Sequence, residues 1–153
     1  MKDEYSMALA AMMALCSRRE YCSKEIERKL AVRDLSDEQR ERILVRLQKE
    51  KFLDDGRYAE FFVNDKSRIS GWGRRKIAYA LSAKGISQNL IESALEGMDS
   101  ESNAMTLERV LKAKSRSLKE SDPVKRREKL VRFALGRGFD YAEILDVLKR
   151  TVL

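Results

Sequence analysis

A pattern of apolar residues repeats about every 50 positions along this chain of 153 residues, and it restricts the possible folds more than any other feature. Apolar residues four positions apart, as on one face of a helix, recur 51 positions further on and again 53 positions beyond that. One copy is too short for a large core, so successive copies are expected to pack on one another as an array. The matching residues are Ile26, Leu30 and Leu35, then Ile77, Leu81, Gly85, Ile86, Ile91 and Leu95, then Leu130, Gly138, Phe139, Ile144 and Leu148.

Helix-start signals divide each copy into three helices. The single proline and the abundance of Leu, Ala, Glu, Lys and Arg also favour helix. Gly85 follows a helix where a residue with positive φ belongs. The sequence thus predicts an all-α fold, an elongated tandem array of three three-helix units at residues 1–51, 52–98 and 99–153. The expected helices span 4–17 and about 100–118, and others begin at Ser23, Ser36, Asp54 or Asp55, after Gly73, at Ser87, at Asp122-Pro123 and near Asp140.

Residue types that carry catalysis or bind metals are scarce. The chain has no histidine, so a Ser-His or Cys-His nucleophilic pair cannot be built. The only cysteines, Cys16 and Cys22, are interpreted as free thiols, with a disulfide or half a metal site as the alternative. Asp54 and Asp55 suit helix capping better than Mg²⁺ binding. We therefore expect a non-enzymatic protein without metal or cofactor and, since no apolar run reaches the length of a membrane span, a cytoplasmic one.

Positive charge is concentrated after residue 55. Residues 1–55 hold 12 basic and 12 acidic side chains, so the other 20 basic and 13 acidic ones carry the whole net charge of +7. Such an imbalance favours an anionic partner, although a solvated basic face is the alternative. Trp72 and Tyr79 lie beside the first of two basic clusters, where Trp72 either stacks on a partner or packs between two helices. The first cluster is Arg68, Arg74, Arg75, Lys76 and Lys84, and the second is Lys125, Arg126, Arg127, Lys129, Arg132 and Arg137.

The segment Gly71-Trp72-Gly73 precedes three basic residues, as a phosphate-binding loop might. It lacks the preceding strand and the GxxxxGK[ST] spacing, so it is not a P-loop. The free N–H groups of the helix that follows are nevertheless expected to be able to accept a phosphate oxygen. The helix beginning at Ser23 is expected to have only half a capping box, because Ile26 stands where Glu is usual.

The middle of the chain resembles the RecX family of bacterial recombinase regulators. The resemblance rests on FLDDGRYAEFF at 52–62 and SRISGWGRRKIAYALSAKGIS at 67–87, and the three-unit layout extends it over the whole chain. The first unit departs from the pattern, with Arg33-Asp34 where Lys84-Gly85 stands in the second. The resemblance implies a regulator built from tandem three-helix bundles that binds the RecA–DNA filament. It also implies inhibition of RecA ATPase, strand exchange and coprotease activity, with roles in recombination, DNA repair and the SOS response.

We expect the two basic clusters, with Trp72, to make the contact with RecA or with DNA in the filament, and the protein to act as a monomer. The alternative is a stand-alone helical DNA-binding protein. In that case helix-turn-helix-like units would place the helices that carry Arg74 or Arg126 in DNA grooves.

Overall fold

The structure is a computed structural model that describes residues 3–153. The described residues form nine helices and no strand, which confirms the all-α prediction. None of these helices is both long and apolar enough to cross a membrane. The helices are α1 (Glu4–Arg18), α2 (Ser23–Ala31), α3 (Asp37–Lys49), α4 (Asp55–Arg68), α5 (Arg74–Ala83), α6 (Gln88–Glu96), α7 (Ser100–Ser117), α8 (Pro123–Gly136) and α9 (Tyr141–Arg150).

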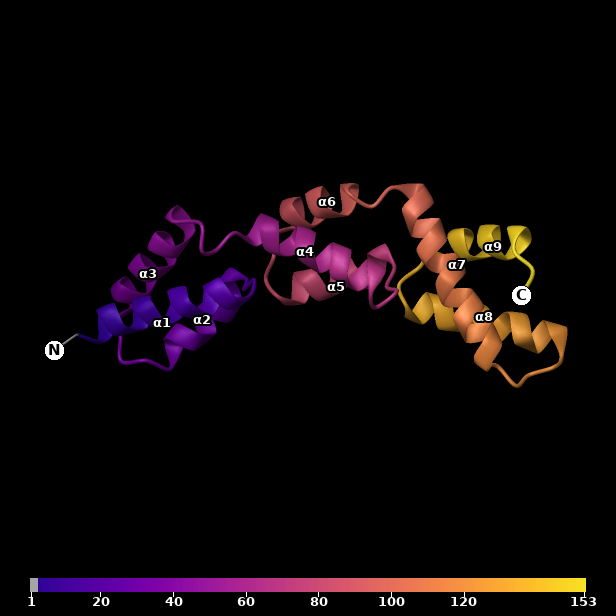
Figure 1. Ribbon diagram of the computed structural model, residues 1–153, viewed down its shortest axis with the longest axis horizontal. Coiled ribbons are helices and arrows are strands. Elements are labelled where there is room, and N and C mark those ends of the chain that lie inside the picture. Colours follow the sequence, from indigo (N-terminus) through magenta and orange to yellow (C-terminus); the bar gives the residue numbers. More distant parts are fainter. Residues whose placement is uncertain (1–2) are drawn as a thin grey trace.

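The helices lie in three groups of three, arranged end to end, with the chain termini at opposite ends (Figure 1). We call α1–α3, α4–α6 and α7–α9 the first, second and third units. The accessible surface is 9800 Å². A compact globular protein of 17.7 kDa is expected to expose about 7900 Å². The excess surface follows from the extended arrangement and accommodates the high charged fraction of 37%.

Each unit surrounds its own apolar core. The first core is built around Ile26, Leu30 and Ile43 and also takes in Phe52 and Leu53, which follow α3. The second core contains residues of α4–α6 together with Cys22, which precedes α2. The third is built from α7–α9. The division at residues 51/52 and 98/99 stays a prediction, because these cores draw on residues from both sides of the first boundary.

Side-chain caps fix most helix starts where the sequence predicts them. Ser36, Asp54 and Ser87 each accept a hydrogen bond from the backbone N–H three residues later. α2 begins at Ser23, as predicted, but the expectation of only half a capping box was wrong. Its N-cap is Cys22, and the capping box is complete because Glu25 accepts from the Cys22 N–H at 3.0 Å. A thiol is not a usual cap, so the residue pattern pointed to the neighbouring serine.

Three glycines adopt left-handed backbone conformations. Gly85 has φ of 82°, as the repeat predicts, and Gly138 at the equivalent position of the third unit has φ of 96°. Gly71 has φ of 67° in the turn between α4 and α5. Side chains other than hydrogen are strained in this region, so these glycines permit the tight turns that bring neighbouring helices together.

Candidate partner-binding surface

The loop between α4 and α5 joins the second unit to the third. The Gly73 N–H donates to the Arg137 carbonyl at 2.7 Å, and the Arg75 N–H donates to the Gly138 carbonyl at 3.2 Å. A β-carbon on Gly73 would lie 2.5 Å from the Gly138 oxygen, and one on Gly138 would lie 2.5 Å from the Lys76 nitrogen. The expectation of a phosphate site at the N-terminus of α5 was therefore wrong. Backbone carbonyls of the α8–α9 turn already occupy it, a contact between residues far apart in sequence.

Two residues of the basic clusters bond to backbone at or near this joint. Arg137 donates to the Ser70 carbonyl at 2.8 Å and lies over the Phe133 ring at 4.9 Å. Arg74 donates to the Met98 carbonyl at the end of α6. Helix C-termini present carbonyls without intrahelical partners, and cations there also favour the helix dipole. Both side chains are half-buried. They contribute first to holding helices in place.

Arg126 folds back onto the C-terminal end of α7. Its guanidinium donates to the Ser115 carbonyl at 2.7 Å, the Ser115 hydroxyl at 2.6 Å and the Glu120 carbonyl at 3.2 Å. Arg126 is half-buried, unlike its exposed neighbour Arg127. Lys129 lies nearby and pairs with Glu120 at 3.1 Å, with its side chain 47% exposed.

Trp72 packs against the second core and is half-buried. Its ring meets the Phe62 ring edge-on with centroids 6.3 Å apart, while the ammonium groups of Lys66 and Lys76 lie 5.0 and 4.5 Å from its centroid. Such cation–π contacts with a half-buried indole add to packing. Trp72 thus takes the role of a packing residue between helices, which was one of the two alternatives, and Lys76 is held beside it.

Besides Lys129, five residues of the two basic clusters are exposed, and Lys84 is half-buried. Arg75 pairs loosely with Asp140 at 3.6 Å, with its side chain 72% exposed. Within residues 3–153 the other four make no ion pair. Lys84 is half-buried, and its backbone carbonyl accepts from the Cys22 thiol at 3.7 Å. The exposed residues are Arg68, Arg75, Lys125, Arg127 and Arg132.

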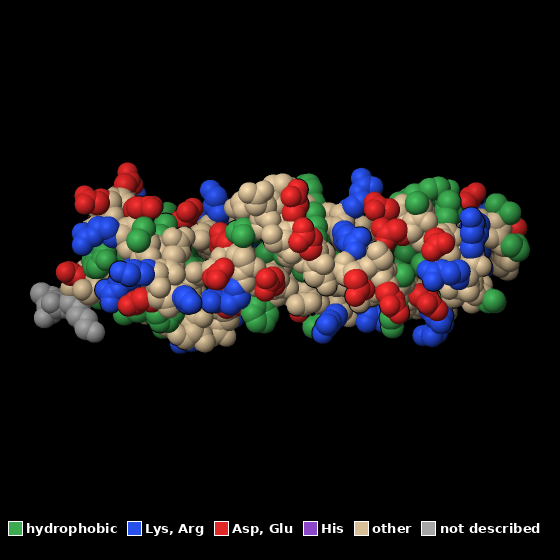
Figure 2. All heavy atoms as spheres, turned by 90° about the horizontal axis from the view of Figure 1, so that it is seen from above, with side chains coloured by type: hydrophobic (Ala, Val, Ile, Leu, Met, Phe, Trp, Pro, Cys, Tyr) green, Lys and Arg blue, Asp and Glu red, His purple; other side chains and the backbone are tan. Residues whose placement is uncertain are grey.

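Except for Arg68, which ends α4, these exposed cations belong to α5 and α8. Figure 1 shows α5 and α8 along its lower side, with α6 and α9 along the upper side. α5 carries three basic residues and no acidic one, whereas α6 carries two acidic residues and no basic one. The molecule seen from above has intermingled acidic and basic side chains (Figure 2). The α5–α8 side is therefore the candidate surface for contact with an anionic partner.

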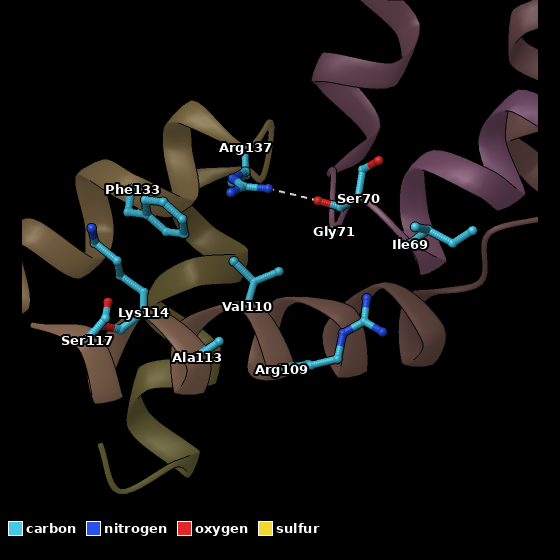
Figure 3. A pocket seen from close by; sticks show the side chains of 10 residues that line it. All are labelled: Ile69, Ser70, Gly71, Arg109, Val110, Ala113, Lys114, Ser117, Phe133 and Arg137. Carbon is cyan, nitrogen blue, oxygen red and sulfur yellow. Dashed lines mark hydrogen bonds between the residues drawn. The ribbon is translucent and has the colours of Figure 1, made fainter.

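Sequence clustering missed two basic residues that lie close to this side. Arg109 and Lys114 of α7 line an open groove together with Phe133 of α8 and Arg137, which directly follows α8 (Figure 3). The signal was present in the sequence, since residues 109–119 contain five basic side chains and no acidic one. The apolar residues of the same segment predict a helix, and the two basic clusters named above do not include its basic residues.

The first and second units are joined by side-chain contacts. Asp55 accepts from the Ser23 N–H at 2.8 Å and from its hydroxyl at 3.1 Å, and Arg57 pairs with Glu20 at 2.9 Å. Asp54 alone caps α4, so the adjacent carboxylates serve different tasks. Cys16 and Cys22 are free thiols, as expected, and burial raises the pKa of both. A raised thiol pKa disfavours the reactive thiolate.

Comparison with known proteins identifies the relatives of this arrangement. Models of the second and third three-helix domains of RecX match residues 54–95 and 104–148. "Regulatory protein RecX" of Clostridium acetobutylicum is 32% identical over 152 residues, 97% of this chain and 70% of that protein. "Regulatory protein RecX" of Chlorobium phaeobacteroides is 38% identical over 134 residues, 88% of this chain and 86% of that protein.

The fold agrees with these sequence matches. The crystal structure of RecX from Lactobacillus salivarius superimposes with a TM-score of 0.88 at 23% identity, covering 98% of this chain and 97% of that one. A sequence identity of 23% supports only a shared fold. The family relationship rests on the matches at 32% and 38% identity. The all-helical tandem architecture, the two domain models and the near-complete alignments agree, and the chain belongs to the RecX family.

Proposed function

We propose that this protein is a non-enzymatic regulator that binds the RecA–DNA filament and inhibits RecA ATPase, strand exchange and coprotease activity. In that role it modulates recombination and DNA repair. The observation that carries the proposal is the match over 97% of the chain to relatives named regulatory proteins. The absence of histidine agrees with a binding protein rather than a hydrolase, because the commonest general base is missing.

The exposed cations on the α5–α8 side are the proposed contact. Lys125, Arg127 and Arg132 project from α8 without ion pairs in the part of the chain that the structure describes, and Arg75 is held only by an exposed pair. An extended array suits a filament because contacts from successive units add, although each exposed pair is weak and screened by salt. Arg74 and Arg126 are less suited, since a partner would have to break their bonds to backbone carbonyls.

The test is inhibition of RecA ATPase on single-stranded DNA by the purified protein. We expect inhibition at concentrations far below those needed to coat the DNA. Inhibition only at coating concentrations would indicate the alternative, a stand-alone DNA-binding protein. No inhibition of ATPase, strand exchange or repressor cleavage at any concentration would contradict the proposal.

A triple variant tests the surface itself. Replacing Lys125, Arg127 and Arg132 by Ala is expected to raise the half-inhibitory concentration roughly tenfold, the effect of three exposed pairs of about 0.5 kcal/mol each. The matched control replaces three exposed cations of the first unit and keeps the same net charge; we expect it to inhibit like wild type. Equal inhibition by both variants would place the contact elsewhere. The control residues are Arg18, Arg28 and Lys49.

A further inference from the structure

The groove between the second and third units is open and about 550 Å³ in volume. One wall is formed by Arg109, Val110 and Lys114 of α7. The opposite wall is formed by Phe133 of α8 and by Arg137, which directly follows α8 (Figure 3). The turn that follows α4 closes one end. The remaining lining residues are Ile69, Ser70, Gly71, Ala113 and Ser117.

The charge in this groove has one sign. Three of its ten lining side chains are cationic and none is a carboxylate. Arg109 donates to the Ser67 carbonyl at 3.2 Å and Arg137 to the Ser70 carbonyl, but these acceptors are neutral and each guanidinium keeps further donors. Lys114 lies 4.7 Å from the Phe133 ring and, within residues 3–153, has no acidic partner. The positive charge is therefore left for an external anion.

The same groove exposes apolar surface. Ile69 at its rim is 79% exposed, Ala113 is also exposed, and Val110 and Phe133 are half-buried beside the cations. Large exposed aliphatic side chains next to a concave surface are typical of binding sites. The site thus fits a ligand that joins an anionic group to a flat apolar one.

We propose that this groove binds one nucleotide unit of a single-stranded nucleic acid. Its phosphate would lie against Lys114 and Arg109, and its base against Ile69 and Val110. A basic groove that follows the backbone, with apolar surface for the bases, is the usual design for strand binding. A strand fits better than a free nucleotide, because the groove is open and continues into further basic residues on both helices. These are Arg116 of α7 and Arg132 of α8.

The test measures binding of a fluorescein-labelled oligothymidylate of roughly 15 nucleotides by anisotropy, without any recombinase. The proposal does not rest on the proposed function, because this assay contains no RecA and either assay can fail alone. Lys114→Gln is expected to weaken binding several-fold at low salt. It should also reduce the slope of log K against log salt by about 0.7, the value for one phosphate contact to a single strand.

Lys112→Gln is the matched control, since it removes the same charge two residues away, where Lys112 pairs with Glu108 at 2.9 Å outside the groove. We expect it to bind like wild type. Ile69→Ala is expected to weaken binding without changing the salt slope, whereas Val32→Ala, at a residue 87% exposed in the first unit, is expected to have no effect.

Three outcomes overturn the inference. In the first, Lys114→Gln binds the oligonucleotide like wild type. In the second, Lys112→Gln weakens binding as much as Lys114→Gln, which would show general attraction rather than a site. In the third, the oligonucleotide does not bind while a labelled oligoglutamate does, which would assign the groove to an acidic polypeptide. Thermal melts of all variants keep loss of folding distinguishable from loss of binding.

Discussion

At the scale of single residues, basic side chains that form one cluster in the sequence serve two purposes in the structure. Arg126 and Arg127 are neighbours, yet one bonds to the end of α7 and the other is exposed to solvent. Both were predicted to bind a partner, because the charge of a residue can be seen in the sequence whereas the backbone carbonyls that folding brings next to it cannot. Arg137 shows the same limit, because its partner Ser70 is 67 positions away. The sequence predicts which residues are basic, but not which of them bond to the backbone and which stay exposed to a partner.

Replacing Arg126 by Ala is expected to lower the free energy of unfolding by about 2 kcal/mol, because hydrogen bonds from a charged donor are lost and α7 carbonyls are left without partners. Arg127→Ala removes the same charge from the adjacent, exposed position and is expected to change stability by less than about 0.5 kcal/mol. Urea denaturation of both variants measures the difference. Equal stabilities would show that the Arg126 bonds contribute nothing.

Tyr58 is buried beside the second core, and burial raises the pKa of its phenol to about 12. The unfolded chain ionises tyrosine near pH 10, so between about pH 10 and 12 the unfolded state binds fewer protons than the folded one. The stability contribution is therefore complete below pH 10 and is lost as pH rises towards 12. Tyr58→Phe removes this dependence.

We therefore expect wild type to lose stability relative to Tyr58→Phe between about pH 10 and about pH 12, as measured by urea denaturation. Lysine deprotonation affects both proteins alike. A constant difference between them across that range would mean that Tyr58 ionises in the folded protein as it does in the unfolded chain.

At the scale of elements, local signals and long-range contacts differ in how well they could be predicted. Helix spacing located all nine described helices, because apolar periodicity and capping residues act within a few positions. The docking of the α8–α9 turn on the N-terminus of α5 joins Gly73 to Arg137, 64 positions apart, and no local pattern indicates it. The cation-lined groove depends on the same docking and was missed for the same reason.

Gly138→Ala tests this docking. We expect a loss of at least about 2 kcal/mol of stability, because φ is 96° and the new β-carbon would lie 2.5 Å from the Lys76 nitrogen. The Gly73 amide, which donates to the Arg137 carbonyl, is expected to exchange slowly in wild type and faster in the variant. The control is Gly136→Ala, where nothing lies within 4 Å of the new carbon, and it should stay within about 1 kcal/mol of wild type. Slow exchange at Gly73 in Gly138→Ala would show that the joint tolerates the change.

At the scale of the whole molecule, the repeat in the sequence leads to an elongated shape (Figure 1). Three small cores strung at near-constant spacing expose more surface than one core of the same mass, as the 9800 Å² surface shows. The 51- and 53-residue offsets predict this arrangement, because each copy of the pattern forms a small core of its own and contacts mainly its neighbours.

Small-angle X-ray scattering tests the shape and the predicted monomeric state together. A compact protein of 153 residues has a radius of gyration of about 15 Å. We expect a clearly larger radius, a skewed distance distribution and a forward scattering that corresponds to 17.7 kDa. A radius near the compact value would contradict the extended array, and twice the mass would contradict the monomer.

The burial of Cys22 in the second core also sets an order of assembly on the ribosome. Synthesis delivers the polypeptide from its N-terminus, and the first core is complete once Leu53 has emerged. Cys22 belongs to that early segment, yet its side chain, 0% exposed in the finished protein, lies in a core that extends to Met98. The nascent first unit therefore lacks the residues that cover Cys22 in the finished protein, and α4–α6 supply them once they have been synthesised. We therefore expect the second unit to fold against a first unit that has already formed.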